Sequence, residues 1–478
     1  MSDGLPIEGL RFRLLLAAVL SALVGALLLA SAPADAAQQR PGGSLVQLKG
    51  TAGCLTDSST PKPSCKSVRA LKTPGPFMGS RAIAIPRSGK NLYVASSGSN
   101  AIAVFNRNPK TGKLRQPSGQ AGCVAAREKN GCGEAWGVSG PNSLALSPDG
   151  RFLYASSRNT STVTIYKRDT DTGTLRQLAG SKGCIAGGGL PGCATAIGLN
   201  GPDVITVSPD GKNIYVGSFL GNAIAIFERN QENGQLTQAT DGTGCLANAA
   251  ATGCTTVTGL LAPEGMAVSD DGGSVFVAAP GSNAVLAFTR NPVDGSLAQA
   301  TDGYGCITTN TITGCTTGRE MEGANAVEVS PDDSDVYATS LLSSSVTAFG
   351  RSLEYGGIFQ LSGPLGCTVW IGANDCYPAR GMRSPEGIAF SPDGLNAYIA
   401  AYGTGGIVVL NRNPMTGGTL QKRAPFGCLT LTATQGCGRG RALSGTGGIA
   451  VSPDGRFVYA SGANANSITA FRRVQWGS

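Results

Sequence analysis

Short segments in which hydrophobic and polar residues alternate dominate the chain, and one stretch shows the pattern clearly. Residues 143–147, 152–156, 162–167 and 174–178 are each predicted to form a β-strand, because a period of two is typical of a strand with one buried face. The first two strands are joined by Ser147-Pro148-Asp149-Gly150, with Pro and Gly where a type I turn favours them. No part of the unit shows the three- and four-residue spacing of an amphipathic helix. The pattern predicts four antiparallel strands in each unit.

This unit repeats along the chain with a period of 61 residues. The turn begins at Ser147, Ser208, Ser269, Ser330, Ser391 and Ser452, and a degenerate copy lies at residues 86–89. The second strand carries an aromatic residue in every copy: Tyr93, Tyr154, Tyr215, Phe276, Tyr337, Tyr398 and Tyr459. A fixed period with four antiparallel strands is typical of propeller blades. The sequence therefore predicts an all-β fold, a seven-bladed β-propeller.

The two ends of the chain are predicted to complete one blade together. The last copy stops after its third strand, at residues 467–473. Residues 43–48, Gly-Ser-Leu-Val-Gln-Leu, match residues 173–178, Gly-Thr-Leu-Arg-Gln-Leu, and a Cys follows seven residues after each Gln. We expect the N-terminal strand to close the last blade, which removes an open sheet edge.

The first residues have the three-part layout of a secretory signal. Arg11 and Arg13 precede an almost wholly apolar run over residues 14–30, and small residues follow. This layout predicts a signal peptide over residues 1–36 and the propeller over residues 37–478. We expect a secreted protein, extracellular or in the cell envelope, that stays on a membrane only if the segment is not cleaved.

Composition excludes several kinds of chemistry. None of the 478 residues is His, so a Ser-His-Asp triad, a Cys-His pair and a His-ligated zinc are impossible. The formal net charge is +8, without a dense Lys/Arg block, and this argues against nucleic acid as a partner.

The cysteines occur as one close pair in each period. The pairs are Cys54 and Cys65, Cys123 and Cys132, Cys184 and Cys193, Cys245 and Cys254, Cys306 and Cys315, Cys367 and Cys376, Cys428 and Cys437. An even count of close pairs in an exported protein predicts seven local disulfides, each in the connection from a fourth strand to the next blade. A metal site would need ligands from different blades at one point.

Two further residue types recur in all seven copies and are predicted to be blade scaffolding, because a residue that every blade needs follows the repeat. They are Gln47, Gln116, Gln177, Gln238, Gln299, Gln360 and Gln421, and Arg107, Arg168, Arg229, Arg290, Arg351, Arg412 and Arg473.

A ring of varied residues begins the first strands, five positions before each turn Ser. It consists of Arg81, Asn142, Asp203, Glu264, Asn325, Glu386 and Gly447. The oxygens of Asp203, Glu264, Asn325 and Glu386 are the hard donors that Ca²⁺ prefers, so we consider a calcium site at the axis. The alternative is that these side chains hydrogen-bond the strand entrance. Arg81 and Asn142 are candidate ligand-binding residues.

Glu328 breaks the repeat two positions before the turn Ser, where the other copies have Ala84, Ala145, Thr206, Ala267, Ala389 and Ala450. A buried carboxylate is costly unless it is paired or protonated, so Glu328 is a candidate catalytic residue. Glu322, Trp370, Arg383 and Arg441 lie on connections predicted for the same face and are further candidates for ligand contact or catalysis. The alternative is a solvated ion-pair cluster with locally packed aromatics.

The repeats resemble those of a known family. Residues 147–154, Ser-Pro-Asp-Gly-Arg-Phe-Leu-Tyr, and residues 208–216, Ser-Pro-Asp-Gly-Lys-Asn-Ile-Tyr-Val, resemble the YVTN-type repeats of seven-bladed lactonase-like propellers. That group includes the propeller type of 6-phosphogluconolactonase and fungal carboxymuconate cyclase. The resemblance covers all seven copies and implies lactone chemistry at the channel mouth by Arg, Glu and, in the cyclase type, a His. Since this chain has no His, only Glu and Arg candidates carry over.

Two functions fit these features. The first is an exported binding or scaffold module whose disulfide-stapled loop face recognises a glycan, a peptide or another protein. The second is a hydrolase of a small lactone, calcium-assisted, with Glu328 or Glu264 as base and Arg383 or Arg81 holding the anion. We favour the first because no complete catalytic constellation can be named. Carboxylates converging on one point would favour the enzyme, and carboxylates paired with Arg would favour binding.

Overall fold

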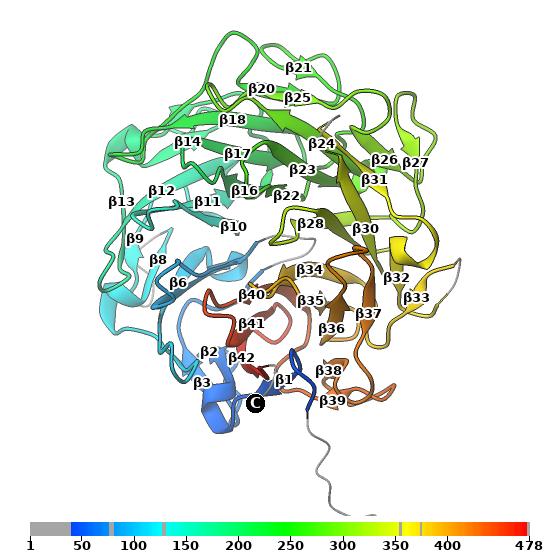
Figure 1. Ribbon diagram of the computed structural model, residues 1–478. Helices are drawn as coiled ribbons and strands as arrows, with labels where there is room; N and C mark the ends of the chain where they lie inside the picture. Colours follow the sequence, from blue (N-terminus) through cyan, green and yellow to red (C-terminus); the bar gives the residue numbers. More distant parts are fainter. Residues whose placement is uncertain (1–39, 76–80, 127–130, 353–355, 373–374, 476–478) are drawn as a thin grey trace, which may run out of the picture. The chain divides into compact units, whose positions relative to one another are not determined.

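The computed structural model describes residues 40–75, 81–126, 131–352, 356–372 and 375–475. The predicted signal peptide, residues 1–36, lies outside these residues. Gly42–Ser478 forms one compact unit, and its described part consists of seven β-sheets arranged in a ring (Figure 1). The predicted seven-bladed propeller is confirmed. The described residues include no helix that is both long and apolar enough to cross a membrane.

The second sheet in the chain shows the plan of a blade. The first three strands, β10 (Pro141–Leu146), β11 (Phe152–Ser157) and β12 (Thr162–Arg168), are antiparallel neighbours. The fourth strand differs from the prediction in being split. Its first half, β13 (Leu175–Gln177), pairs with one end of β12, and its second half, β14 (Cys184–Ala186), pairs with the other.

A short fifth strand extends each sheet. β15 (Ala194–Thr195) pairs with β14 in parallel, with Ile185 opposite Ala194. The split arises because the 3-10 turn η4 (Gly180–Lys182) interrupts the fourth strand. In each blade the first Cys of the pair begins the second half of the fourth strand, so this Cys is part of the sheet.

The other blades follow the same order. The first strands are β4 (Ile83–Ala84), β16 (Pro202–Val207), β22 (Gly265–Val268), β28 (Ala324–Val329), β34 (Pro385–Phe390) and β40 (Thr446–Val451). The second strands are β5 (Asn91–Ser96), β17 (Asn213–Ser218), β23 (Ser274–Ala279), β29 (Asp335–Ser340), β35 (Asn396–Ala401) and β41 (Phe457–Gly462). The third strands are β6 (Ala101–Arg107), β18 (Ala223–Arg229), β24 (Ala284–Arg290), β30 (Ser345–Ser352), β36 (Gly406–Arg412) and β42 (Ser467–Arg473).

The outer strands complete the sheets. Blade 1 has β7 (Leu114–Arg115), β8 (Cys123–Ala125) and β9 (Gly133–Glu134), and blade 3 has β19 (Leu236–Thr237), β20 (Cys245–Ala247) and β21 (Thr255–Thr256). Blade 4 has β25 (Leu297–Gln299), β26 (Cys306–Thr308) and β27 (Thr316–Thr317), and blade 5 has β31 (Gly357–Gln360), β32 (Cys367–Val369) and β33 (Tyr377–Pro378). Blade 6 has β37 (Thr419–Gln421), β38 (Cys428–Thr430) and β39 (Gly438–Arg439). Further 3-10 turns are η1 (Gly50–Gly53), η2 (Ser97–Ser99), η3 (Gly119–Gly122), η5 (Pro280–Ser282) and η6 (Gly363–Gly366).

The N-terminal part of the unit closes the ring. β1 (Leu45–Gln47) pairs with β42, with Leu45 opposite Arg473, and the two strands lie side by side at the bottom of Figure 1. β2 (Cys54–Asp57) pairs with the other half of β42, and β3 (Lys66–Val68) pairs with β2. The predicted closure is therefore confirmed, and it extends to all the outer strands of the last blade.

The recurring Arg and Tyr residues join neighbouring blades. The Arg168 Nε atom donates a hydrogen bond of 2.6 Å to the hydroxyl of Tyr93 in the preceding blade, and that hydroxyl donates to the Gly173 carbonyl. Burial raises the pKa of Tyr93 to about 12, so the phenol stays neutral and keeps its proton as a donor. The Arg set acts as scaffolding, as predicted.

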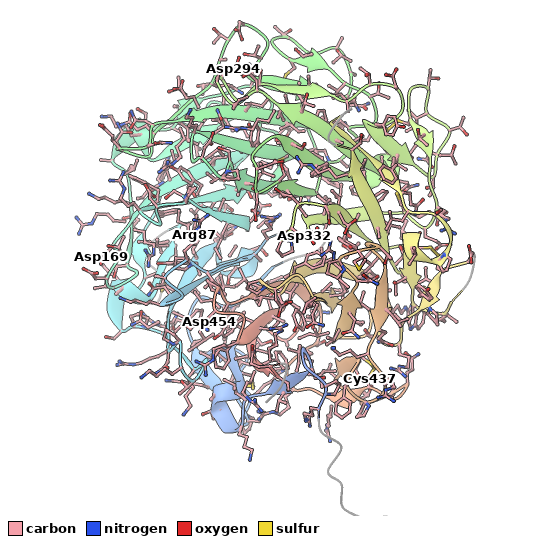
Figure 2. All side chains as sticks on the ribbon, in the orientation of Figure 1. Arg87, Asp169, Asp294, Asp332, Cys437 and Asp454 are labelled. Atoms are coloured by element: carbon pink, nitrogen blue, oxygen red, sulfur yellow. A yellow bond between two sulfur atoms is a disulfide. The ribbon has the colours of Figure 1, made fainter. Side chains whose placement is uncertain are left out.

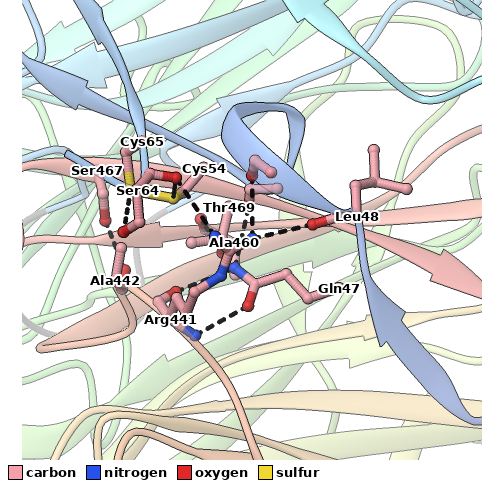
Figure 3. Close-up of a disulfide and its surroundings, with 12 residues drawn as sticks. Gln47, Leu48, Cys54, Ser64, Cys65, Arg441, Ala442, Ala460, Ser467 and Thr469 are labelled. Atoms are coloured by element: carbon pink, nitrogen blue, oxygen red, sulfur yellow. Dashed lines mark hydrogen bonds between the residues drawn. A yellow bond between two sulfur atoms is a disulfide. The ribbon is translucent and has the colours of Figure 1, made fainter. Parts of the chain in front are cut away.

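The recurring Gln residues clamp the connections. The Gln47 side chain accepts from the Arg441 N–H and donates to the Arg441 and Gly53 carbonyls (Figure 3). Gln116, Gln177, Gln238, Gln299, Gln360 and Gln421 make the same three hydrogen bonds in the other blades. This prediction of scaffolding is also confirmed.

All seven predicted disulfides are formed. Each joins the second half of a fourth strand to the segment that leads into the short parallel strand, as Cys184 and Cys193 do between β14 and β15. The bond staples the outer edge of the sheet. So many disulfides indicate an oxidising compartment.

Candidate functional site

The central channel contains a cavity of about 440 Å³. It is lined by residues from the second half of the first strands, among them Leu144, Ile205, Ile388 and Ile449, and polar atoms make up most of its exposed surface. We call the end of the channel formed by the Ser-Pro-Asp-Gly turns the turn end, and the end where the first strands begin the loop end. Because the lining residues stand close to the turns, the cavity occupies the turn side of the channel.

Arg81 and Glu328 form an ion pair in this cavity. The Arg81 Nη2 atom lies 2.5 Å from the Glu328 Oε2 atom. Arg81 belongs to blade 1 and Glu328 to blade 5, which is on the opposite side of a ring of seven. The structure therefore brings together two sequence-predicted residues that are 247 positions apart in the chain.

Small residues surround the Arg81–Glu328 pair. The wall at the level of Glu328 is formed by Ala84, Ala145, Thr206, Ala389 and Ala450, which leave room for two long side chains. The side chains of Arg81 and Glu328 retain 36% and 30% of their exposed area, so a ligand in the cavity can reach both charges. Burial raises the pKa of Glu328, and the charge and hydrogen bond of Arg81 oppose that rise.

Several polar residues of the ring at the start of the first strands make hydrogen bonds or ion pairs with one another and with neighbouring residues. Asp203 is 3% exposed; it accepts a hydrogen bond of 2.5 Å from the Asn142 amide and lies 2.8 Å from the Arg158 Nη1 atom. Burial raises its pKa to about 6, although Arg158 lowers it. Asn325 accepts from Thr339 and donates to the Pro385 carbonyl. Among the ring residues, only Arg81 also lines the cavity.

Glu264 is the most unusual member of the ring. Its side chain is fully buried, and neither carboxyl oxygen has a hydrogen-bond partner in the described part of the chain. Burial raises its pKa to about 9, the negative charges of Asp203 and Glu386 add to the rise, and Arg158 opposes it. Glu264 is therefore protonated at neutral pH.

The predicted calcium ligands do not form a metal cluster. The described residues contain no group of three or more His, Cys, Asp or Glu side chains placed to hold a metal ion. Asp203 is engaged by Asn142 and Arg158, and the Glu386 Oε2 atom lies 2.8 Å from where a Cβ on Gly447 would be. Calcium binding by Asp203, Glu264, Asn325 and Glu386 stays a prediction, and no cluster of metal ligands among the described residues supports it.

The candidates on the connections lie apart from the cavity. The Arg383 guanidinium stands over the Trp370 ring, 5.6 Å from its centroid. The Arg441 side chain donates to the Leu48, Gly50 and Ser64 carbonyls.

Glu322 is also away from the cavity. It is exposed on the connection before β28, and its N–H donates to the Ser343 hydroxyl. None of Glu322, Trp370, Arg383 and Arg441 lines the cavity that holds Arg81 and Glu328.

Sequence reasoning missed two charged residues at the turn end, Arg87 and Asp270. Both occupy the second position of the turn, where Pro148, Pro209, Pro331, Pro392 and Pro453 occupy the other copies. The same comparison between copies that singled out Glu328 would have found them. In Figure 2, Arg87 lies closer to the centre of the ring than Asp169 and Asp294, which lie near its outer edge.

The arrangement can perform two kinds of chemistry. A guanidinium and a carboxylate inside a cavity can anchor the charged groups of a ligand. The same two groups can activate water at the carboxylate and stabilise a developing oxyanion at the guanidinium. Of the carboxylates in our criterion, Asp203 and Glu328 pair with Arg, and Glu264 interacts with Asp203 and Glu386.

Comparison with known proteins gives a family for the fold. A family model described as lactonase, 7-bladed β-propeller matches residues 133–185, 191–306 and 377–477, together more than half of the chain. No match was found among the curated proteins.

Two solved structures illustrate the likeness in fold. Hydrazine synthase of Kuenenia stuttgartiensis is 17% identical, with 84% of this chain and 97% of that chain covered and a TM-score of 0.51. A periplasmic gluconolactonase of Pseudomonas aeruginosa is 16% identical, with 80% and 93% covered and a TM-score of 0.50. At these identities the likeness concerns the fold alone.

Proposed function

We propose that this chain, which belongs to the lactonase family of seven-bladed β-propellers, is an exported binding protein that holds a small ligand in its central channel. The observation that carries the proposal is the Arg81–Glu328 pair, which lies inside a cavity and keeps part of its surface exposed there. Both residues occur where the repeat is broken, as expected of a site that binds one ligand. The cavity would enclose the ligand, and the pair would fix its charged groups.

Export has separate support. The first residues have the layout of a signal peptide, and seven disulfides need an oxidising compartment. A structural relative is described as periplasmic. We place the protein outside the cell or in the cell envelope. The stapled loop face stays a predicted surface for a glycan, peptide or protein partner.

The binding proposal is tested by titrating the mature protein with small carboxylates, amines, amino acids and lactones, using calorimetry. At least one class should bind the wild type, and the double variant R81M/E328M should lose that binding while it keeps its circular dichroism spectrum. A control variant, R151M, removes a surface pair with Asp149 and should bind as the wild type does. Equal affinities of wild type and R81M/E328M would contradict the proposal, as would absence of binding by every class.

Hydrolysis of a small lactone is the second candidate function, favoured by the carboxylate of Glu328 beside a guanidinium in the cavity. Glu328 would take a proton from water, the hydroxide oxygen would bond to the lactone carbonyl carbon, and Arg81 would stabilise the oxyanion. The ring C–O bond would then break, and the proton held by Glu328 would pass to the leaving alkoxide. Turnover of sugar and aliphatic lactones, with and without a chelator, should disappear in E328Q; equal rates would exclude Glu328 as the base.

A further inference from the structure

The turn end of the channel carries charges of opposite sign on opposite sides. Blade 1 supplies Arg87, two residues after the lining residue Ile85, and blade 4 supplies Asp270 directly after β22 and its turn Ser269. In a ring of seven, blades 4 and 5 are the two that lie opposite blade 1. Arg87 and Asp270 are exposed on their turns, and neither lines the cavity.

The anionic side is built around a second departure from the repeat. Asp333 replaces the Gly of the turn in blade 5, and its carboxylate accepts hydrogen bonds of 2.8 Å from the N–H groups of Asp270 and Asp271. These bonds fix the turn that carries Asp270 to the neighbouring turn.

The charges of the two sides interact. Burial and the charge of Asp333 raise the pKa of Asp270, and the guanidinium of Arg87 opposes the rise. Asp270 also contributes to the raised pKa of Glu328. Asp270 therefore interacts electrostatically with both Arg87 and Glu328.

We infer that the channel takes a small zwitterion, with its carboxylate directed to Arg81 and its ammonium to Glu328. This inference rests on the proposed binding function and narrows it to one ligand class. A zwitterion can separate the Arg81–Glu328 pair and leave neither charge without a partner. A ligand with one charge would pair with one residue and leave the other half-buried and uncompensated, which is costly.

The cavity adds a second requirement. Polar atoms make up most of the exposed surface of the cavity, and its volume of about 440 Å³ falls in the usual range for small-ligand sites. An amino acid or short peptide with free ends satisfies the charges and fits this volume.

The test uses three versions of one dipeptide in calorimetric titrations of the mature protein. Leucyl-leucine carries both charges, N-acetyl-leucyl-leucine carries only the carboxylate, and leucyl-leucinamide carries only the ammonium. The free dipeptide should bind about tenfold or more tightly than either capped form, because each cap removes one ion pair. In E328Q the N-acetyl form should bind as well as the free dipeptide, and in R81Q the amide form should do so.

The outcomes separate the inference from the proposal on which it rests. If the wild type binds a capped form as tightly as the free dipeptide, the zwitterion is wrong, although the channel still binds ligands. If the wild type binds none of the three, nor any class in the wider panel, the proposed function itself fails. The variant R151Q, which changes a turn outside the cavity lining, should keep the preference of the wild type. Thermal unfolding of every variant checks that the fold is kept.

Discussion

Phe276 occupies the position at which six blades carry a tyrosine, and the Nε atom of Arg351 in the next blade has no hydrogen-bond partner among the described residues. In the six other pairs, the Arg Nε atom donates to the tyrosine hydroxyl at 2.6 to 2.9 Å. Arg351 keeps its contacts with Asp271 and Ser274. The junction between blades 4 and 5 thus lacks one interblade hydrogen bond.

We predict that F276Y stabilises the protein, because the new hydroxyl supplies an acceptor for a buried donor. A hydrogen bond to a charged group contributes about 1.5 to 3 kcal/mol, and part of this is lost in fitting the hydroxyl, so we expect a gain of about 1 kcal/mol. Chemical denaturation of wild type and F276Y measures it. The control Y215F should destabilise, since it leaves the Arg290 Nε atom unpaired. A lower unfolding free energy for F276Y than for wild type would contradict this account.

The ring closure depends on Gly43. Its φ is +82°, and a Cβ there would lie 2.1 Å from the Asn396 Oδ1 atom, which the Arg473 guanidinium holds. Gly50 offers a matched control, because its φ is +56° but nothing lies within 4 Å of a Cβ. We expect G50A to cost about 1 to 2 kcal/mol from backbone strain alone, and G43A to cost clearly more. Equal losses in thermal or chemical unfolding would show that the contact with Asn396 is easily relieved.

The disulfides should each stabilise the fold by a similar amount. Cys184 and Cys193 close a loop of nine residues, and Cys54 and Cys65 close one of eleven in the blade built from both ends. On the chain-entropy model, loops of this length give about 2 to 3 kcal/mol. Replacing either pair with Ser should lower the unfolding free energy by about that amount. A much larger loss for the Cys54–Cys65 pair would mean that this bond supports ring closure as well as its own loop.

Repetition explains how much of the fold the sequence could predict. The 61-residue period exposes the blades, the match of residues 43–48 to 173–178 reveals the closing strand, and the invariance of Arg and Gln between copies marks them as scaffolding. The split of the fourth strand was missed because its second half, β14, has only three residues, too few to show an alternation after the Gly-rich turn η4, although it pairs with the same strand, β12, as the first half.

The site was predicted less completely, for a physical reason. Departures from the repeat identify Glu328, but its partner Arg81 depends on which side chains reach across the channel, and the period gives no information on that. Arg383 and Arg441 look equally suitable in sequence, yet the structure directs one to Trp370 and the other to backbone carbonyls. A long, flexible side chain pairs with a group that lies near it in the folded protein, and the sequence does not show which group that is.

The buried Glu264 predicts how stability changes with pH. Its pKa rises from an ordinary 4.5 to about 9 in the folded protein. Between these values the unfolded chain has released this proton while the folded protein still holds it, so the free energy of unfolding falls as pH rises. Asp203, whose pKa rises to about 6, adds to the fall only below about that pH. Glu328, whose pKa burial raises, and Lys422, whose pKa burial lowers to about 8, also change stability with pH. The contribution of Glu264 is therefore measured as the difference between wild type and E264Q, because both proteins contain Glu328 and Lys422.

We predict that E264Q flattens the decline between about pH 6.5 and 9, because the amide keeps the shape of the protonated acid and has no proton to release. Wild type and E264Q should differ little near pH 5, and E264Q should be the more stable protein at pH 9. Urea denaturation at pH 5, 6.5, 8 and 9 measures both curves. The control E228Q alters an exposed carboxylate on β18 and should follow the wild type. If E264Q declines as steeply as wild type, Glu264 is not the group that carries the raised pKa.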